Sequence, residues 1–333
     1  MVFLTLIFIG LGFSSTASFA TPAAPSVIFI TLDGVRTQEF FSHTEYLPRF
    51  KAYAQKNGFI FGERQGAHPR PMKISDSVAL SLPGYRAILS GQFESTCLSN
   101  DCKQIDHETI FDRLAFEFSD RHSVAAFTSW NRMSRALESI PRHFVSSVGL
   151  GSIQGLSAEE QKPYLAIQER AFADEPTHWL ECRYDRYTFE MGLKFLKEYQ
   201  PRFLYLSFID TDEWAHQKDY LAYVRALKDW DERFSELIKS LDEMGEYSQN
   251  TSIVVTTDHG RGLRKHWSNH NLLMPNAFKV WAVVIPSKEF TRIHHPVVLP
   301  REVYSHLQIR PTLELLLGLK PELADQTYFT QGQ

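Results

Sequence analysis

Residues 26–34 read SVIFITLDG, a short β-branched and apolar run that stops at an acidic residue and a glycine. Such a run predicts a parallel strand that is buried on both faces and ends at a polar loop. Residues 202–209 (RFLYLSFI) and 252–257 (SIVVTT) have the same character, and acidic residues follow both. Helical patterns lie between these strands. The pattern predicts an α/β fold with a doubly wound, mostly parallel central sheet and helices on both faces.

The remaining elements follow from hydrophobic period and from proline and glycine boundaries. We predict helices at Thr44–Asn57, Pro83–Ser90, Ile105–Glu117, Ala158–Phe172, Tyr184–Tyr199, Lys218–Met244 and Arg310–Leu317, and further strands at Ser123–Phe127 and Phe278–Ile285. No internal repeat interrupts this alternation. We expect residues 21–333 to form one catalytic domain, with a small cap lobe from roughly 97 to 184.

The first 20 residues form a separate segment. They carry no charged residue, and the apolar run at 2–13 is shorter than the roughly 20 residues of a membrane span. Small residues at Ser18 and Ala20 fit a cleavage site after Ala20. An uncleaved signal anchor is the alternative. The pattern favours a signal peptide, and therefore a periplasmic or secreted protein with no membrane span in the mature chain.

Composition excludes several classes of protein. The chain has 333 residues with 43% apolar and 22% charged residues, which is close to the globular average. A net charge of −4 gives no basic footprint for nucleic acid. Cys97 and Cys102 lie five apart in a polar loop, where they either pair in an oxidising compartment or remain free thiols. Cys182 is left over and is expected to pack as a small hydrophobe.

Acidic residues follow three of the predicted strands: Asp33, the pair Asp210 and Asp212, and Asp258. The carboxyl ends of parallel strands form the ligand crevice of an open α/β sheet, so these carboxylates should converge. Because they repel one another, a positive charge must lie between them.

Histidines accompany two of these acidic positions. His216 follows Asp212 by four residues, which can place both on one side of a helical turn, and His259 follows Asp258 directly. His266 and His270 come soon after. Carboxylate and imidazole ligands together suit zinc, or less selectively manganese or iron.

Ser81 precedes Pro83, which is expected to open a helix. Helix N-termini bind anions through free N–H groups and the helix dipole. A serine hydroxyl held there beside a metal would lose its proton readily and attack phosphorus. The alternative is an ordinary N-cap serine, which would occupy the same place.

These motifs, taken in order, resemble the alkaline phosphatase superfamily, in particular its type I phosphodiesterase and nucleotide pyrophosphatase branch. The resemblance extends from about residue 26 to 320. It rests on Asp33-Gly34, Ser81-x-Pro83, Asp212-x-x-x-His216, Asp258-His259-Gly260 and a later histidine. It implies that one metal is held by Asp33, Ser81, Asp258 and His259, and a second by Asp212, His216 and His270.

For two of these ligand positions the sequence offers a second candidate residue. Asp212 is preferred to Asp210 because the family's aspartate and histidine are four residues apart. His270 is preferred to His266 because Trp267 precedes it, as in the branch.

The resemblance implies a two-metal hydrolase of small-molecule phosphoesters that acts through a covalent phospho-Ser81 enzyme, with zinc or manganese as cofactor. The branch has an asparagine three residues after the nucleophile, where it contacts a phosphate oxygen. Gly84 stands there in this chain. The hydrogen bond must come from elsewhere, with a backbone N–H or Tyr85 as candidates. Arg261 and Trp214 are further candidates for contact with substrate.

Other functions remain alternatives. Sulfatases of the same superfamily carry Cys or Ser followed by x-Pro-x-Arg, whereas Tyr85 occupies the arginine position here and Arg86 comes one residue late. An independent-type phosphoglycerate mutase would be a phosphotransferase, but the signal peptide disfavours a glycolytic role. A non-catalytic binding protein on this scaffold would be expected to lack some of the ligands. A Ser-His-Asp hydrolase would be expected to have a G-x-S-x-G elbow around Ser81.

Overall fold

The computed structural model describes residues 24–63, 69–75, 78–141, 144–174, 182–323 and 326–330. The predicted signal peptide, residues 1–20, lies outside these ranges. Among the residues that are described, no helix is both long enough and apolar enough to cross a bilayer.

The centre of the molecule is a seven-stranded sheet with the order β2-β8-β7-β1-β6-β4-β5. Its strands are β1 (Ser26–Leu32), β2 (Phe59–Phe61), β4 (Val124–Thr128), β5 (Val145–Val148), β6 (Phe203–Phe208), β7 (Thr251–Thr256) and β8 (Ala282–Ile285). Strands β5, β4, β6, β1 and β7 run parallel, and β8 pairs antiparallel with both β7 and β2. The predicted mostly parallel α/β sheet is therefore confirmed.

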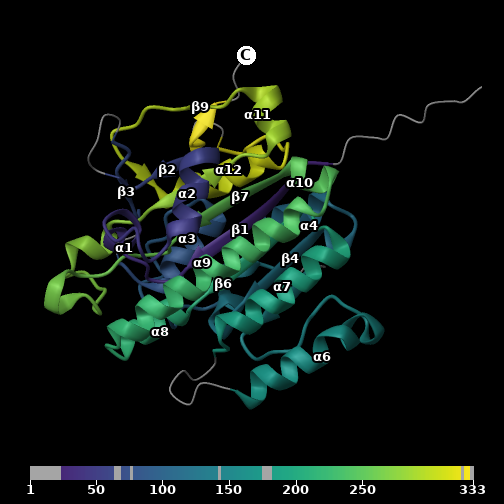
Figure 1. Ribbon diagram of the computed structural model, residues 1–333, viewed down its shortest axis with the longest axis horizontal. Coiled ribbons are helices and arrows are strands. Elements are labelled where there is room, and N and C mark those ends of the chain that lie inside the picture. The colour runs from purple at the N-terminus through teal and green to yellow at the C-terminus, as the bar shows by residue number, and fades with distance from the viewer. Residues whose placement is uncertain are drawn as a thin grey trace, which may run out of the picture.

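Helices cover both faces of the sheet. The described helices are α1 (Thr37–Phe41), α2 (Pro48–Asn57), α3 (Ser81–Ser90), α4 (Ile110–Glu117), α5 (Ser134–Leu137), α6 (Ala158–Ala173), α7 (Asp185–Tyr199), α8 (Asp210–His216), α9 (Tyr220–Asp242), α10 (Glu246–Asn250), α11 (Lys288–His294) and α12 (Ile309–Leu316). Side chains of β1 alternate between two apolar clusters. Val27 belongs to a cluster that includes residues of α3, α4 and α12, and Ile28 belongs to a cluster that includes residues of α2, α6, α7 and α9. Figure 1 shows α7 and the long α9 side by side across one face.

Strand register brings the acidic turns to one edge of the sheet. Leu32 at the end of β1 lies opposite Phe208 at the end of β6, and Thr31 lies opposite Thr256 at the end of β7. The three strands thus end at the same level, and the residues that follow them meet there. All residues of β1, β6 and β7 are buried, as their apolar sequences predict.

The structure refines the predicted boundaries. The predicted helix 105–117 begins only at Ile110, because Thr109 and Asp112 form a capping box at that point. Two strands of the central sheet, β4 and β5, lie inside the range predicted for a cap lobe. Any cap is therefore confined to the other segments of that range. Small sheets pair β3 (Met72–Lys73) with β10 (Tyr304–Ser305) and β9 (Val297–Val298) with β11 (Phe329–Thr330), and neither pairing was predicted.

The cysteine alternatives are resolved by geometry. Cys97 and Cys102 form a disulfide with their Cα atoms 5.5 Å apart. Cys182 is free and buried, as expected.

Candidate active site

The first turn of the site follows β1. Asp33 is fully buried, and Gly34 adopts a left-handed backbone with φ of +65°. A Cβ atom on Gly34 would lie 2.7 Å from Asp212 Oδ1 and 2.8 Å from Arg261 Nε, so glycine is required for two reasons. The Gly34 N–H donates to Asp258 Oδ1 at 2.9 Å. This bond joins the turns after β1 and β7.

Asp33, Asp258 and His259 form one group of potential metal ligands, with ligand atoms within 4.8 Å of one another. All three side chains are fully buried. Burial and the neighbouring Asp258 raise the pKa of Asp33 well above its usual range, because two carboxylates repel each other in a dry site. Asp258 Oδ2 accepts no hydrogen bond from any described residue.

His259 lies where the ligands meet. Its Nδ1 is 2.9 Å from the carbonyl oxygen of Gly260, which assigns the proton to Nδ1 and leaves a lone pair on Nε2. That Nε2 is 3.5 Å from Asp33 Oδ1, 3.4 Å from Asp258 Oδ2 and 3.8 Å from Asp212 Oδ1. Burial lowers the pKa of His259, so the neutral ligand form is favoured.

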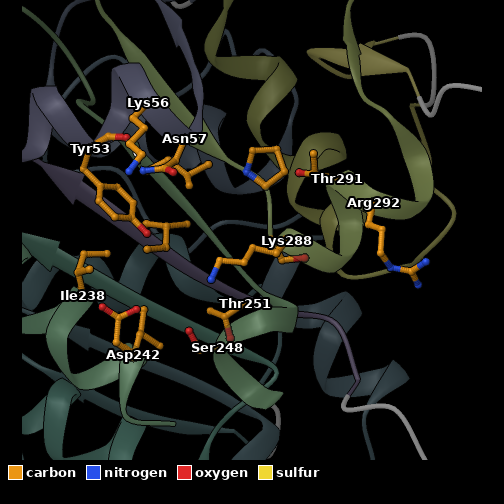
Figure 2. A pocket seen from close by; sticks show the side chains of 15 residues that line it. Tyr53, Lys56, Asn57, Ile238, Asp242, Ser248, Thr251, Lys288, Thr291 and Arg292 are labelled. Atoms are coloured by element: carbon orange, nitrogen blue, oxygen red, sulfur yellow. Dashed lines mark hydrogen bonds between the residues drawn. The ribbon is translucent and has the colours of Figure 1, made fainter. Parts of the chain in front are cut away.

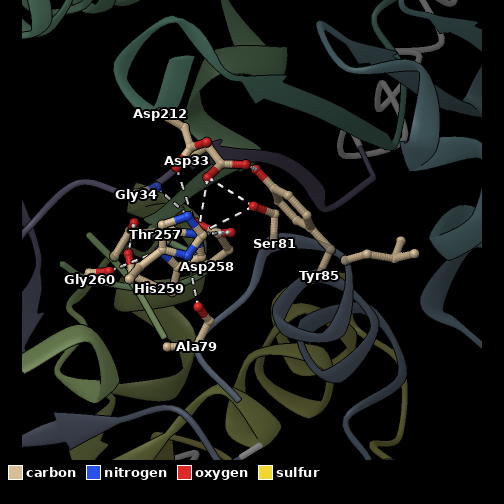
Figure 3. Close-up of polar contacts among 12 residues, drawn as sticks. Asp33, Gly34, Ala79, Ser81, Tyr85, Asp212, Thr257, Asp258, His259 and Gly260 are labelled. Carbon is tan, nitrogen blue, oxygen red and sulfur yellow. Dashed lines mark hydrogen bonds and ion pairs between the residues drawn. The ribbon is translucent and has the colours of Figure 1, made fainter. Parts of the chain in front are cut away.

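Ser81 points into this group (Figure 3). Its Oγ lies 3.4 Å from Asp33 Oδ1 and 3.2 Å from His259 Nε2. Ser81 is the first residue of α3, and the N-cap position belongs to Leu80, which makes no side-chain cap bond. The N-cap alternative therefore does not describe this hydroxyl, which faces the carboxylates instead.

A second group consists of Asp212, His259 and His270. His216 Nε2 lies 3.0 Å from Asp212 Oδ2 and 3.2 Å from His270 Nε2. His270 Nδ1 is 2.8 Å from the carbonyl oxygen of Ala79, which leaves its Nε2 lone pair directed at His216. The four-residue spacing from Asp212 to His216 does place both residues on α8, and they lie together with His270.

The competing residues lie elsewhere. Asp210 Oδ1 accepts from the Asp185 N–H at 3.0 Å, and the Asp210 N–H donates to Asp185 Oδ2 at 3.0 Å. Asp210 therefore joins β6 to the start of α7 and belongs to neither ligand group. His266 is exposed. Trp214 lines a separate cavity of about 210 Å³ together with Asp210.

Arg261 is the charged partner of Asp212. Its guanidinium is fully buried, contacts Asp212 Oδ1, and also donates to the carbonyl oxygen of Ser268. Burial lowers the Arg261 pKa to about 9. The arginine thus joins α8 to the loop that carries His270, and both of its terminal nitrogens are engaged.

Gly84 and Tyr85 have tightly defined surroundings. A Cβ on Gly84 would lie 2.9 Å from the carbonyl oxygen of Asp258, so no side chain fits at this position. The Gly84 N–H donates to the carbonyl oxygen of Leu80 at 3.0 Å. The Tyr85 hydroxyl donates to Asp33 Oδ2 at 2.9 Å. The Gly84 N–H and the Tyr85 hydroxyl are therefore already engaged within the protein.

The residues fit divalent metals. Three buried carboxylates converge at the ends of three strands, and no described residue donates to Asp258 Oδ2. Imidazole lone pairs of His259 and His270 face the same space. Nitrogen and oxygen donors of this kind are typical of zinc and manganese sites. Carbonyl oxygens hold the far nitrogen of both imidazoles, as in known metal sites.

Several supporting residues were not identified from the sequence. Thr211 Oγ1 donates to the carbonyl oxygen of Asp33 at 2.6 Å. Thr257 Oγ1 accepts from the Val35 N–H at 3.0 Å, and buried His306 contacts the carbonyl oxygen of Thr257 through Nε2 at 2.9 Å. Threonine is common in strands and turns, so nothing in the local sequence distinguishes these residues.

One family model matches part of the chain. Residues 185–272, which include five of the predicted metal ligands, match the family model described as Metalloenzyme superfamily. No curated protein matches the sequence.

Solved structures share the fold. A protein in the alkaline phosphatase superfamily from Vibrio parahaemolyticus is 15% identical, with a TM-score of 0.56 over 89% of this chain and 67% of that chain. The C-terminal periplasmic domain of EcEptC from Escherichia coli, in complex with Zn, is 11% identical, with a TM-score of 0.58 over 93% and 87%. The phosphonate monoester hydrolase SpPMH from Silicibacter pomeroyi is 14% identical, with a TM-score of 0.53 over 89% and 74%.

The expected resemblance to the alkaline phosphatase superfamily is confirmed by the family-model match and by the fold. At these identities the structural likeness concerns the fold. The nature of the reaction has to be argued from the site itself.

Proposed function

We propose that this protein hydrolyses phosphoesters, with Ser81 as the nucleophile and two bound divalent cations, Zn²⁺ or Mn²⁺. The observation that carries the proposal is the position of Ser81 Oγ, 3.2 Å from His259 Nε2 and 3.4 Å from Asp33 Oδ1. A reactive hydroxyl thus lies among buried ligands that need positive charge between them.

The proposed ligands fall into two groups, one for each cation. Asp33, Asp258 and His259 would hold the first, together with Ser81, and Asp212, His216 and His270 would hold the second. Once bound, the cations would supply the positive charge that lowers the pKa of the serine hydroxyl and stabilises developing negative charge on the phosphoryl oxygens.

The residues of the chain then perform the displacement. Ser81 Oγ gives up its proton to water and attacks phosphorus while the bond to the leaving oxygen breaks, and the leaving oxygen takes up a proton from water. Water then hydrolyses the phosphoserine and restores the hydroxyl. Tyr85 and Thr211 hold Asp33 in place throughout, through its side chain and its carbonyl oxygen.

The sulfatase alternative is disfavoured by the position of Arg86. This side chain is buried, forms an ion pair with Glu94 at 2.7 Å, and donates to the carbonyl oxygen of Lys103 at 2.7 Å. It is therefore held by the loop after α3 rather than beside Ser81. The predicted signal peptide and the Cys97–Cys102 disulfide support an oxidising periplasmic or extracellular location.

Bound metal and turnover should be measured together on the mature protein. We expect two molar equivalents of zinc or manganese, and turnover of p-nitrophenyl phosphate or bis-p-nitrophenyl phosphate that is abolished in Ser81→Ala. Ser90→Ala, at the other end of α3, is the matched control and should retain activity. Turnover of p-nitrophenyl sulfate alone would favour a sulfatase. Folded protein with neither metal nor turnover would contradict the proposal and leave a binding role.

A further inference from the structure

The loop of residues 262–274, between β7 and β8, exposes three large apolar side chains. Leu272 is 62% exposed, Leu273 is 81% exposed, and Leu263 near the other end of the loop is 39% exposed. Among the described residues, Leu272 and Leu273 are the only large apolar side chains that are exposed at consecutive positions. Single exposed apolar residues are common on folded proteins, whereas a group of them on one loop indicates an interaction surface.

Hydrogen bonds within the 262–274 loop hold these side chains outward. The Gly262 N–H donates to the carbonyl oxygen of Asn269 at 2.8 Å, which closes the first part of the loop. The Leu273 N–H donates to Asn271 Oδ1 at 2.9 Å, and the Met274 N–H donates to the carbonyl oxygen of Asn271 at 3.0 Å. The leucines are therefore presented by an ordered backbone.

A different apolar residue anchors the loop to the rest of the molecule. Trp267 is half-buried, and its ring centroid lies 4.9 Å from that of Tyr220 and 5.5 Å from that of Tyr223, at the start of α9. Leu221, which follows Tyr220 directly, is exposed as well. Figure 1 shows the light green segment after β7 projecting from the side of the molecule near α1. The leucines thus lie on a projecting loop that is anchored without them.

The charges of this region are of one sign. No acidic residue lies between Asp258 and Glu289, although the whole chain has a net charge of −4. Arg264 and Lys265 are exposed, and neither forms an ion pair with a described residue. Two such cations beside exposed leucines are complementary to a surface that is anionic and has an apolar layer beneath it.

The 262–274 loop also lies beside the opening of the candidate active site. It carries His270, whose Nε2 is 3.2 Å from His216 Nε2. The His216 side chain is 49% exposed, whereas Asp33 and Asp258 are fully buried, so the site meets solvent on the side of His216. A surface bound by the loop would therefore adjoin this opening.

We propose that the 262–274 loop docks on an anionic lipid surface. Leu272 and Leu273 insert among the acyl chains, and Arg264 and Lys265 contact the phosphates of the headgroups. A stable protein partner would need a complementary face of about 800 Å². A lipid surface instead adapts to a projecting loop. Docking does not require that the site hydrolyse a phosphoester, so this inference stands apart from the proposed function.

Sedimentation with vesicles tests the proposal on the mature protein. Vesicles of phosphatidylcholine and phosphatidylglycerol in equal parts are compared with vesicles of phosphatidylcholine alone. We expect wild type to bind the mixed vesicles at low salt and to be released as the salt concentration rises. Leu272→Ser with Leu273→Ser should weaken binding by about 10-fold or more, because two apolar side chains no longer leave water. Arg264→Ser with Lys265→Ser should weaken binding by about 10-fold, on the mixed vesicles only.

Matched controls lie at the opposite edge of the sheet. Ile293→Ser with Val297→Ser removes two exposed apolar side chains there, and Lys56→Ser with Lys288→Ser changes the net charge as much as the cation variant of the loop does. Both controls should bind vesicles like wild type. Metal content and Tm should be unchanged in all variants, which separates docking from folding.

Insertion has a readout of its own. In Leu273→Trp, the mixed vesicles should shift the fluorescence emission toward shorter wavelengths. Lipids brominated on their acyl chains should quench this variant more than they quench wild type. Ile293→Trp, on α11, should respond no more than wild type does.

Each outcome decides the proposal. Wild type that does not bind the mixed vesicles would overturn it, and so would equal binding by wild type and both loop variants. Loss of binding in the cation variant alone would show adsorption without insertion and would also overturn it. A wild-type dimer that the leucine variant lacks, without vesicle binding, would assign the loop to a second copy of the chain instead. Failure of the proposed function is seen separately, as absence of phosphoester turnover.

Discussion

The two edges of the central sheet carry very different polar groups. At the edge where β1, β6 and β7 end, Asp33, Asp258 and His259 are fully buried within a few ångströms of one another. At the opposite edge a cavity of about 480 Å³ lies beside the start of β7 and the end of β8, and Figure 2 shows its charged residues, among them Lys56 and Lys288, arranged around an open space.

The difference lies in desolvation. Lys56 and Lys288 are exposed, so water solvates them and screens their charges. The carboxylates at the other edge have lost that water and depend on one another and on a cation. The volume of a cavity therefore does not identify a reactive site, whereas buried charged groups that converge do indicate one. The following predictions test this contrast in order of decreasing effect.

The largest effect is expected from His259→Ala. Its Nε2 lies within 3.8 Å of Asp33, Asp258 and Asp212, so both proposed cation sites should be disturbed. We expect bound metal to fall and kcat/KM to drop by about 1,000-fold. Elemental analysis and turnover measure this, with His266→Ala as the matched control. Full metal content and activity in His259→Ala would contradict the proposed cation sites.

Arg261→Met should cause the largest loss of stability. The substitution leaves the buried carboxylate of Asp212 without its cationic partner, which costs about 3–5 kcal/mol in metal-free protein. Arg264→Met, three residues later on the exposed surface, should change the free energy of unfolding little. Urea unfolding of both variants after treatment with a chelator compares their free energies of unfolding with that of wild type. Equal values would show that Asp212 does not need Arg261.

Removal of the metal should lower the thermal stability more at high pH than at low pH. The pKa of Asp33 is raised in the folded metal-free protein, so folding favours its protonated form. The resulting penalty is absent below the unfolded pKa of about 4, grows as pH rises toward the folded pKa, and persists above it. The loss of Tm on chelation should therefore be larger at pH 8 than at pH 5. In Asp33→Asn this difference should shrink, and an unchanged difference would assign it to other groups.

The disulfide loop should have a moderate effect. Cys97→Ser with Cys102→Ser should lower the free energy of unfolding by about 2 kcal/mol. Urea unfolding of the double variant beside wild type measures this change. The same free energy of unfolding in both proteins would show that the bridge contributes nothing to stability.

The smallest effect is expected at the opposite edge. Lys56→Ala and Lys288→Ala remove two exposed cations from the large cavity. We expect kcat/KM and Tm to remain close to wild type, because exposed charges contribute little. Loss of turnover in either variant would mean that this cavity takes part in the reaction and that the two edges do not differ in function.

Much of the fold could be predicted from sequence. The apolar runs of β1, β6 and β7 are buried on both faces, and their lengths and order follow from this pattern. Short edge elements such as β5 escaped prediction, because VSSV carries only half of the apolar signal of a central strand. The helix predicted from Ile105 begins only after Thr109, because the capping box formed by Thr109 and Asp112 fixes its first turn there.

The candidate site could likewise be predicted only in part. Acidic turns after predicted strands identified Asp33, Asp212 and Asp258, and the spacing to histidine favoured Asp212 over Asp210. The bond that holds Asp210 to Asp185 required the structure, since the two residues belong to different elements.

Residue types alone predict which strands are buried and which chemical groups follow them, because burial and turns leave local patterns of residue type. How those groups are used follows from contacts that form when the chain folds. Folding directs Tyr85 to Asp33 and Arg261 to Asp212. These contacts join side chains distant in sequence, and their geometry depends on how the helices and loops pack against the sheet. No local periodicity records such contacts.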